Sequence, residues 1–138
     1  MKPLFAVAAL YGSMAVGFSQ NNPDDTLENY MKQLQANPRN SLAHYRMAEI
    51  FMRQQNYQSA ANEFRAALNG DLEPKWTEVW SHINLGNIFD ITGQRERAVN
   101  EYNLAVRTKD NTQGAQEKAA KYLKSPYERQ KKTSESSW

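Results

Sequence analysis

Residues 47–67 read MAEIFMRQQNYQSAANEFRAA, and residues 85–105 read LGNIFDITGQRERAVNEYNLA. The two stretches align without a gap, 38 residues apart, and small and large side chains recur in them at the same offsets. A repeat of this size is typical of helical arrays, in which each unit covers the apolar face of its neighbour. The recurring positions are Ala48, Phe51, Ala60, Phe64 and Ala67, followed by Gly86, Phe89, Ala98, Tyr102 and Ala105.

Apolar side chains also recur at helical spacing on both sides of the two copies. We expect helices over residues 27–36, 42–53, 59–68, 74–91, 96–108 and 113–123. Ser41 is expected to cap the second helix and Pro74 to open the fourth. Gly70 is expected to end the third helix in a left-handed conformation, and Gly93 to turn the chain before the fifth. No segment alternates polar and apolar residues over the length of a strand, so the sequence predicts an all-α fold.

The pattern resembles the tetratricopeptide repeat (TPR), a helix-turn-helix pair of about 34 residues with small and large residues at fixed offsets. The resemblance implies an α-solenoid of antiparallel helix pairs, with a TPR domain over residues 24–124 and full repeats at about 41–74 and 79–112. A half-repeat helix would precede them and a capping helix would follow. The small residues let two helix backbones approach, and the aromatic residues fill the space beside them.

Two features depart from the family pattern. His44 and His82 stand near the start of the first helix of each repeat, where the family usually has a large residue. The copies are also about four residues further apart than the family period, roughly one helical turn. We place this excess in residues 70–78, as a longer loop or as an extended helix that begins at Pro74.

Stacked helix pairs form a concave face, and the first helix of each pair lines most of it. The resemblance assigns to this partner-binding groove Leu42, Tyr45, Glu49, Met52, Arg53, Trp80, Ile83, Asn84, Asn87 and Asp90. This mixture of apolar and amide side chains suits an extended peptide or a partner helix, and aromatic anchors dominate such interfaces. The resemblance therefore implies a non-catalytic interaction module or scaffold whose partner is a protein or peptide.

Some members of the family bind the C-terminal carboxylate of a peptide with lysine, arginine and asparagine on their first helices. Asn84 would suit such a site, but Tyr45 and Glu49 stand where a cation and an amide would be needed. Because Glu49 would repel a carboxylate, the sequence argues against this mode of binding.

The two ends of the chain differ from the repeats in composition. Residues 1–19 have one early lysine, an apolar stretch and small residues at their end, which is typical of a secretory signal peptide. Residues 20–23 would be a linker, and residues 125–138 a disordered polar tail. This organisation predicts an exported protein, in the periplasm or outside a bacterial cell. The alternative is a membrane-tethered assembly factor, held by an uncleaved N-terminus and by the basic residues Lys118, Lys121, Lys124, Arg129, Lys131 and Lys132.

Several functions lack support in the sequence. The chain has no cysteine, which excludes disulfides and thiolate chemistry, and a net charge of only +2 argues against nucleic-acid binding. No phosphate loop, nucleophile elbow or zinc-protease motif is present, so we expect neither an enzyme nor a cofactor. His44 and His82 could share a metal, but we see no carboxylate that recurs with them and predict no metal site. Self-association through one end of a short array remains open.

Overall fold

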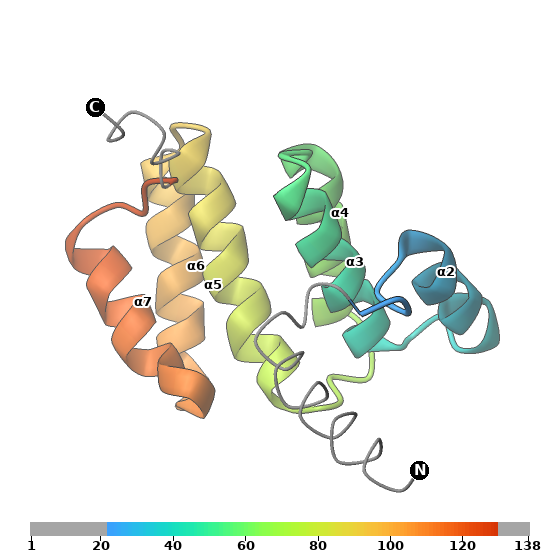
Figure 1. Cartoon of the computed structure of the whole chain (residues 1–138). Helices are drawn as coiled ribbons and strands as arrows, with labels where there is room; N and C mark the ends of the chain where they lie inside the picture. The colour runs from blue at the N-terminus through green and yellow to red at the C-terminus, as the bar shows by residue number, and fades with distance from the viewer. Residues whose placement is uncertain (1–21, 130–138) are drawn as a thin grey trace, which may run out of the picture.

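The computed structural model describes residues 22–129, so the predicted signal peptide and residues 130–138 of the predicted tail lie outside the described part. Within it the chain forms helices and no strand, which confirms the all-α prediction (Figure 1). The helices are α2 (Leu27–Ala36), α3 (Ser41–Arg53), α4 (Tyr57–Leu68), α5 (Trp76–Ile91), α6 (Arg95–Arg107) and α7 (Ala115–Lys124), with a short 3-10 turn at Thr112–Gly114. None of these helices is both long and apolar enough to cross a bilayer.

The N-cap of α3 is not the predicted Ser41. Asn40 is the N-cap, and its side-chain oxygen accepts a hydrogen bond from the backbone N–H of Ala43 at 3.0 Å. Ser41 is instead the first residue of the helix and is fully buried. Its hydroxyl donates to the carbonyl of Ala67 at 2.6 Å and accepts from the N–H of Leu72 at 2.9 Å. Ser41 therefore ties α3 to the end of α4 and does not cap its own helix.

The role expected for Gly70 is also wrong. The residue with a left-handed backbone after α4 is Leu72, at a φ of 57°. Gly70 is needed for a different reason, because a Cβ at this position would lie 2.4 Å from the hydroxyl of Ser41 and 2.6 Å from the carbonyl oxygen of Arg39. Gly93 does turn the chain as expected, and it does so with a left-handed φ of 78°.

The expected starts of α5 and α7 shift by a few residues. Pro74 precedes α5, which begins at Trp76, and the carbonyl of Pro74 accepts the N–H of Thr77 at 3.0 Å. By the repeat spacing, Ser41 at the start of α3 corresponds to Val79, so α5 begins earlier than its counterpart. Part of the extra sequence between the copies is therefore an added helical segment of α5. The last helix begins at Ala115, after the 3-10 turn.

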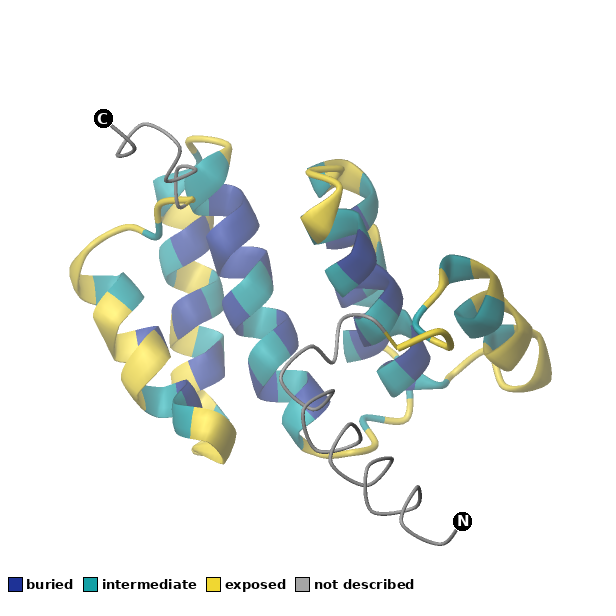
Figure 2. Cartoon of the chain, viewed as in Figure 1, coloured by how far each residue is buried: buried dark blue, intermediate teal, exposed yellow. Residues whose placement is uncertain are grey.

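Neighbouring helices pack in a regular order. α3 packs along α4 and α5 along α6, and each pair is joined by a short turn. α5 packs mainly on α4 and less on α3, and α7 packs in the same way mainly on α6 and less on α5. Figure 2 shows the buried residues on the facing sides of these helices. The recurring alanines Ala48, Ala60, Ala98 and Ala105 are all fully buried.

α2 packs differently from the other helices. It lies against α3, yet none of its residues is buried, and Met31 is 54% exposed. A polar contact with the rest of the chain comes from Asp25, which precedes the helix. Asp25 accepts hydrogen bonds from Arg53 at 2.8 Å and from the hydroxyl of Tyr30 at 2.8 Å. Burial and this bond to Asp25 raise the pKa of Tyr30 to about 12.

Candidate binding surfaces

The predicted groove residues divide into a buried and an accessible group. Tyr45, Ile83 and Asn87 are respectively 5%, 0% and 8% exposed, so the structure places them in the core. Tyr45 packs edge-on against Phe64 and Trp76, with ring centroids 5.4 Å and 5.2 Å away. A partner cannot reach these side chains without moving a neighbour. Leu42, Met52, Trp80 and Asn84 are half-buried, and Glu49 and Arg53 expose 35% and 49% of their side chains. The side chain of Asp90, also predicted for the groove, is only 1% exposed and belongs to the buried group.

Arg46 and Trp76 extend this face, although neither is among the predicted groove residues. The guanidinium of Arg46 lies over the rings of Tyr45 and Trp76, at 5.8 Å and 5.5 Å from their centroids. It also donates to the carboxylate of Glu49 at 2.9 Å. Burial raises the pKa of the Tyr45 phenol, so this side chain stays neutral across the physiological range. Trp76 lies in the added segment of α5, and for that reason the repeat pattern could not indicate it.

Trp80 and Asn84 connect successive helix pairs. The indole N–H of Trp80 donates to the carbonyl of Thr112 at 3.0 Å, which ties α5 to the turn before α7. The amide of Asn84 donates to the carbonyl of Trp80 at 2.8 Å and to the hydroxyl of Tyr45 at 3.3 Å. α3 and α5 therefore present one surface, the inner face, whose accessible residues are Leu42, Arg46, Glu49, Met52, Arg53, Trp80 and Asn84.

The two histidines form a repeated ion pair. His44 Nδ1 lies 2.7 Å from Glu63 Oε1, and His82 Nδ1 lies 2.8 Å from Glu101 Oε1. The statement that no carboxylate recurs with the histidines is therefore wrong, because Glu63 and Glu101 are themselves one repeat apart. One ion pair joins α3 to α4, and the other joins α5 to α6. No three potential metal ligands gather among residues 22–129, and the structure gives the histidines a packing role.

The two histidines differ in the contact made by Nε2. Nε2 of His44 lies 3.0 Å from the carbonyl oxygen of Pro38, so both ring nitrogens face acceptors. Two acceptors favour the doubly protonated imidazolium. The hydrogen bond to Glu63 accordingly raises the pKa of His44 above its usual value.

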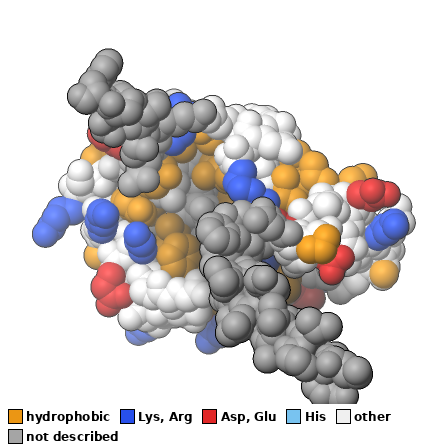
Figure 3. Space-filling view, in the orientation of Figure 1, with side chains coloured by type: hydrophobic (Ala, Val, Ile, Leu, Met, Phe, Trp, Pro, Cys, Tyr) orange, Lys and Arg blue, Asp and Glu red, His pale blue; other side chains and the backbone are white. Residues whose placement is uncertain are grey.

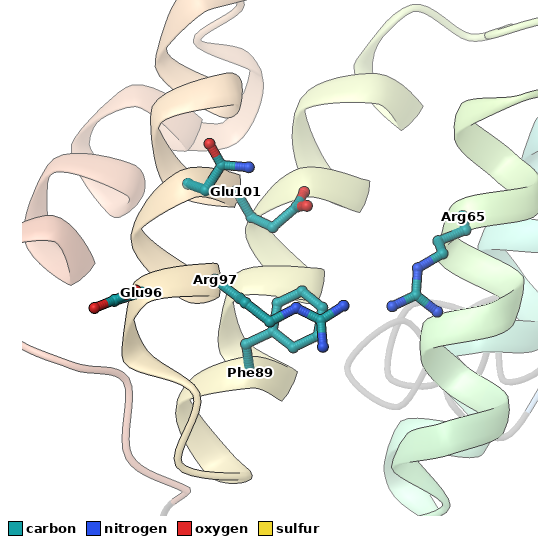
Figure 4. A pocket seen from close by; sticks show the side chains of 6 residues that line it. Arg65, Phe89, Glu96, Arg97 and Glu101 are labelled. Carbon is teal, nitrogen blue, oxygen red and sulfur yellow. The ribbon is translucent and has the colours of Figure 1, made fainter.

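A cleft of about 410 Å³ lies on the opposite side, between α4 and α6 (Figure 4). The guanidinium of Arg97 stacks 4.2 Å from the ring centroid of Phe89, and that of Arg65 lies 5.9 Å from it. Glu96 and Glu101 also line the cleft. Positive and negative groups thus balance here, and Glu101 is already bound to His82. We call this the outer cleft; it contains no nucleophile beside a base.

The start of the predicted polar tail, as far as residue 129, makes contacts with the helices. This segment is not helical, but Tyr127 is half-buried and its backbone N–H donates to Asp90 Oδ2 at 2.9 Å. The Asp90 side chain is 1% exposed. The same carboxylate also lies 3.0 Å from Arg95 Nη1 and 2.8 Å from the hydroxyl of Tyr102. Asp90 therefore joins α5, α6 and the C-terminal segment.

Comparisons with known proteins leave the family open. No protein-family model matches this chain, and no curated protein matches it either.

Proposed function

We propose that this chain is a non-catalytic scaffold of the TPR type, an α-solenoid of antiparallel helix pairs that binds a protein partner on its inner face. The observation that carries this proposal is the repeated packing of α5 on α4 and of α7 on α6. Recurring small residues at the helix crossings support it, because equivalent packing from pair to pair is the principle of a solenoid. α7 would then be the first helix of an incomplete third repeat, with its polar side turned to solvent as a cap.

The chemistry of the inner face favours a mixed-charge, partly apolar ligand. Arg46 and Glu49 form an ion pair with each other. Arg53 pairs with Asp25, but 49% of its side chain stays exposed and can contact a partner. Trp80 and Met52 supply apolar contact area beside these charges. Aromatic side chains and arginine carry much of the energy in protein interfaces. An extended peptide or a helix with apolar anchors and flanking charges would match this surface.

The test is capture of a partner from extract by the mature chain and by a charge-reversal variant of the inner face, Glu49→Lys with Arg53→Glu. Both side chains are at least one-third exposed, so the variant should keep its fold, which circular dichroism checks. The matched control is Arg65→Glu with Arg97→Glu in the outer cleft. Partner loss in the first variant alone supports the proposal. Loss only in the control, or equal capture by all three proteins, contradicts it.

We further propose that the protein is exported, with residues 1–19 as a cleaved signal peptide. The exposed side of α7 supports the alternative of a membrane-tethered assembly factor, because Lys118, Lys121 and Lys124 all lie there. Figure 3 shows basic side chains along the edge of the molecule where Figure 1 places α7. Mass spectrometry of the native N-terminus separates the two proposals: an N-terminus near Gln20 supports export with cleavage, and an intact Met1 supports the tether.

A further inference from the structure

The C-terminal ends of α5 and α7 form a notch that the chain's own segment 125–129 occupies in part. The segment leaves α7 and turns toward the end of α5 (Figure 1). Ser125 is extended, at φ −147° and ψ 132°, and the next residues continue without helix. We use the term end notch for the surface made by Asp90, Ile91, Lys118, Lys121 and Tyr122.

One residue provides most of the attachment. Tyr127 donates its backbone N–H to Asp90, and its ring packs edge-on against Tyr122 with centroids 5.3 Å apart. Ser125, Pro126, Glu128 and Arg129 are exposed. The exposed residues of the segment make two further hydrogen bonds, from the Ser125 N–H to the carbonyl of Lys121 at 3.0 Å, which ends α7, and from Arg129 to the hydroxyl of Tyr57 at 3.3 Å. An attachment through a single aromatic residue can be exchanged at low cost, because few contacts are lost.

The notch is held in place by residues other than the segment. Asp90 keeps Arg95 and the hydroxyl of Tyr102 as partners when Tyr127 leaves. Arg95 also donates to the carbonyls of Tyr122 and Leu123 at 2.8 Å and 2.9 Å, which fixes the end of α7 beside Asp90. A buried carboxylate that loses one of three donors gains a free acceptor site directed at the notch. The site is therefore preorganised for an incoming backbone N–H.

Two hollows flank the segment and show that it does not fill the notch. One, of about 390 Å³, is lined by Asp90, Ile91 and residues 127–129. The other, of about 480 Å³, is lined by Lys118, Lys121, Tyr122 and residues 125–128. Glu128 borders both hollows and makes no ion pair within the described part of the chain. The two lysines place positive charge where the residue after the aromatic anchor lies.

We propose that the end notch is a docking site for an extended peptide segment in which an aromatic residue follows proline and precedes a carboxylate. Segment 125–129 occupies this site in the isolated chain, and a segment of the same chemistry from a partner displaces it. The aromatic ring stacks on Tyr122, the backbone N–H binds Asp90, and the carboxylate lies near Lys118 and Lys121. The inference deepens the proposed function, since it names a partner chemistry for a second surface of the same scaffold.

The test uses the full chain and a labelled peptide with the sequence of residues 123–129, LKSPYER, followed by fluorescence anisotropy. A tethered segment acts at an effective concentration of about millimolar, so the wild-type chain competes with the peptide. The variant Tyr127→Ala lacks the anchor of the tethered segment and should bind the peptide at least about tenfold more tightly than wild type. A peptide with alanine in place of tyrosine should not bind either chain.

Two further variants define the site. Arg129→Ala removes the weak contact to Tyr57 and keeps the anchor, so its affinity should stay within about twofold of wild type, because the competing tether is intact. Lys118→Glu with Lys121→Glu, placed in the Tyr127→Ala chain, should lower affinity and reduce its salt dependence. Tyr127 lies beyond the last helix, so circular dichroism should be unchanged by its replacement.

Three results would overturn the proposal: equal affinity of the wild-type and Tyr127→Ala chains, equal binding of the alanine peptide, or no binding up to millimolar peptide. Hydrogen exchange gives an independent readout in the wild-type chain, where saturating peptide should remove protection of the Tyr127 amide. The inner-face variant of α3 should bind this peptide as the parent chain does. If the peptide experiment fails while the inner-face variant loses its partner, the end notch is rejected and the proposed scaffold function stands.

Discussion

Each of the two helix pairs packs a small residue of one helix beside an aromatic side chain of the other, but the residues differ between the pairs. In the first pair Ala48 stands beside α4, whose aromatic residue is Phe64. In the second pair Gly86 stands at the equivalent position, and the aromatic residue of α6 is Tyr102. Both aromatic side chains are fully buried. The pairs therefore differ by one methyl group on one side of the contact and one hydroxyl group on the other.

The hydroxyl group explains the glycine. It lies 2.9 Å from the side-chain oxygen of Asn87 and 2.8 Å from that of Asp90, both on α5. These contacts hold the ring across α5, so that a Cβ on Gly86 would lie 2.4 Å from Tyr102 Cε1. Phe64 has no such anchor, and α3 tolerates alanine. A polar contact in one helix pair thus determines which small residue the neighbouring position requires.

The largest effect should come from Gly86→Ala, which forces the methyl group into the fixed ring of Tyr102. Overpacking of this kind costs about 1–3 kcal/mol, partly offset by the better helix propensity of alanine. Urea denaturation should show this fall in the free energy of unfolding. The matched change Ala48→Gly should cost only about 1 kcal/mol, since it removes a methyl group and adds chain entropy. Equal effects at both positions would show that the ring of Tyr102 is free to move.

Tyr102→Phe should make the second pair resemble the first. The change leaves Asp90 with Arg95 and Tyr127, but it removes one buried hydrogen-bond partner, at a cost of about 1–3 kcal/mol. In the Tyr102→Phe background the ring can shift, so Gly86→Ala should cost less there than in the wild type. A double-mutant cycle by urea denaturation measures this coupling. Additive effects would contradict the explanation given for Gly86.

Ser81→Ala should have a smaller effect of the opposite sign. Ser81 is fully buried, and its hydroxyl has no hydrogen-bond partner in the described part of the chain. The equivalent residue of the first pair is Ala43, also fully buried. Removing an unsatisfied buried hydroxyl should raise the free energy of unfolding by up to about 1 kcal/mol. Thermal unfolding provides the check, and a loss of stability would indicate a partner for this hydroxyl.

The smallest effect should be the pH dependence of the His44–Glu63 ion pair. Because Glu63 raises the pKa of folded His44, the pair stabilises the protein fully below the unfolded pKa of about 6.5. This contribution is lost as pH rises through the folded pKa. The Tm difference between wild type and His44→Gln should therefore be larger at pH 6 than at pH 9. Glu63→Gln should remove the same dependence, and a constant difference would contradict the ion pair.

The repeat pattern predicted the helices and their core well, because side-chain periodicity reports which face of each helix is buried. It did not predict the helix starts. Asn40 and Ser41 are both good capping residues, and only the contact of Ser41 with Ala67 decides between them. The need for glycine at position 70 could not be predicted for the same reason, because it comes from the close approach of the Ser41 hydroxyl, 29 residues away in the sequence.

The binding surface was harder to predict from the sequence. Tyr45 has the position of a groove residue, yet Trp76 from the added segment of α5 packs against it. The side-chain periodicity of α3 indicates which face Tyr45 lies on, but not that a residue inserted in α5 covers that face. The C-terminal segment was missed because its polar composition gives no sign that one tyrosine would bind Asp90. The histidine–glutamate pairs, in contrast, were missed although the sequence holds the signal, because Glu63 and Glu101 recur at the same offset as His44 and His82.

The absence of buried residues in α2 has a consequence for how the chain opens. A helix that contributes nothing to the core can detach and reform while α3 to α7 stay folded. Its amide protons should therefore exchange through frequent local openings, whereas those of α5 exchange only when the whole array unfolds. A protease would reach the connection around residues 37–39 during those openings, and the cut would leave the remaining helices as a stable product.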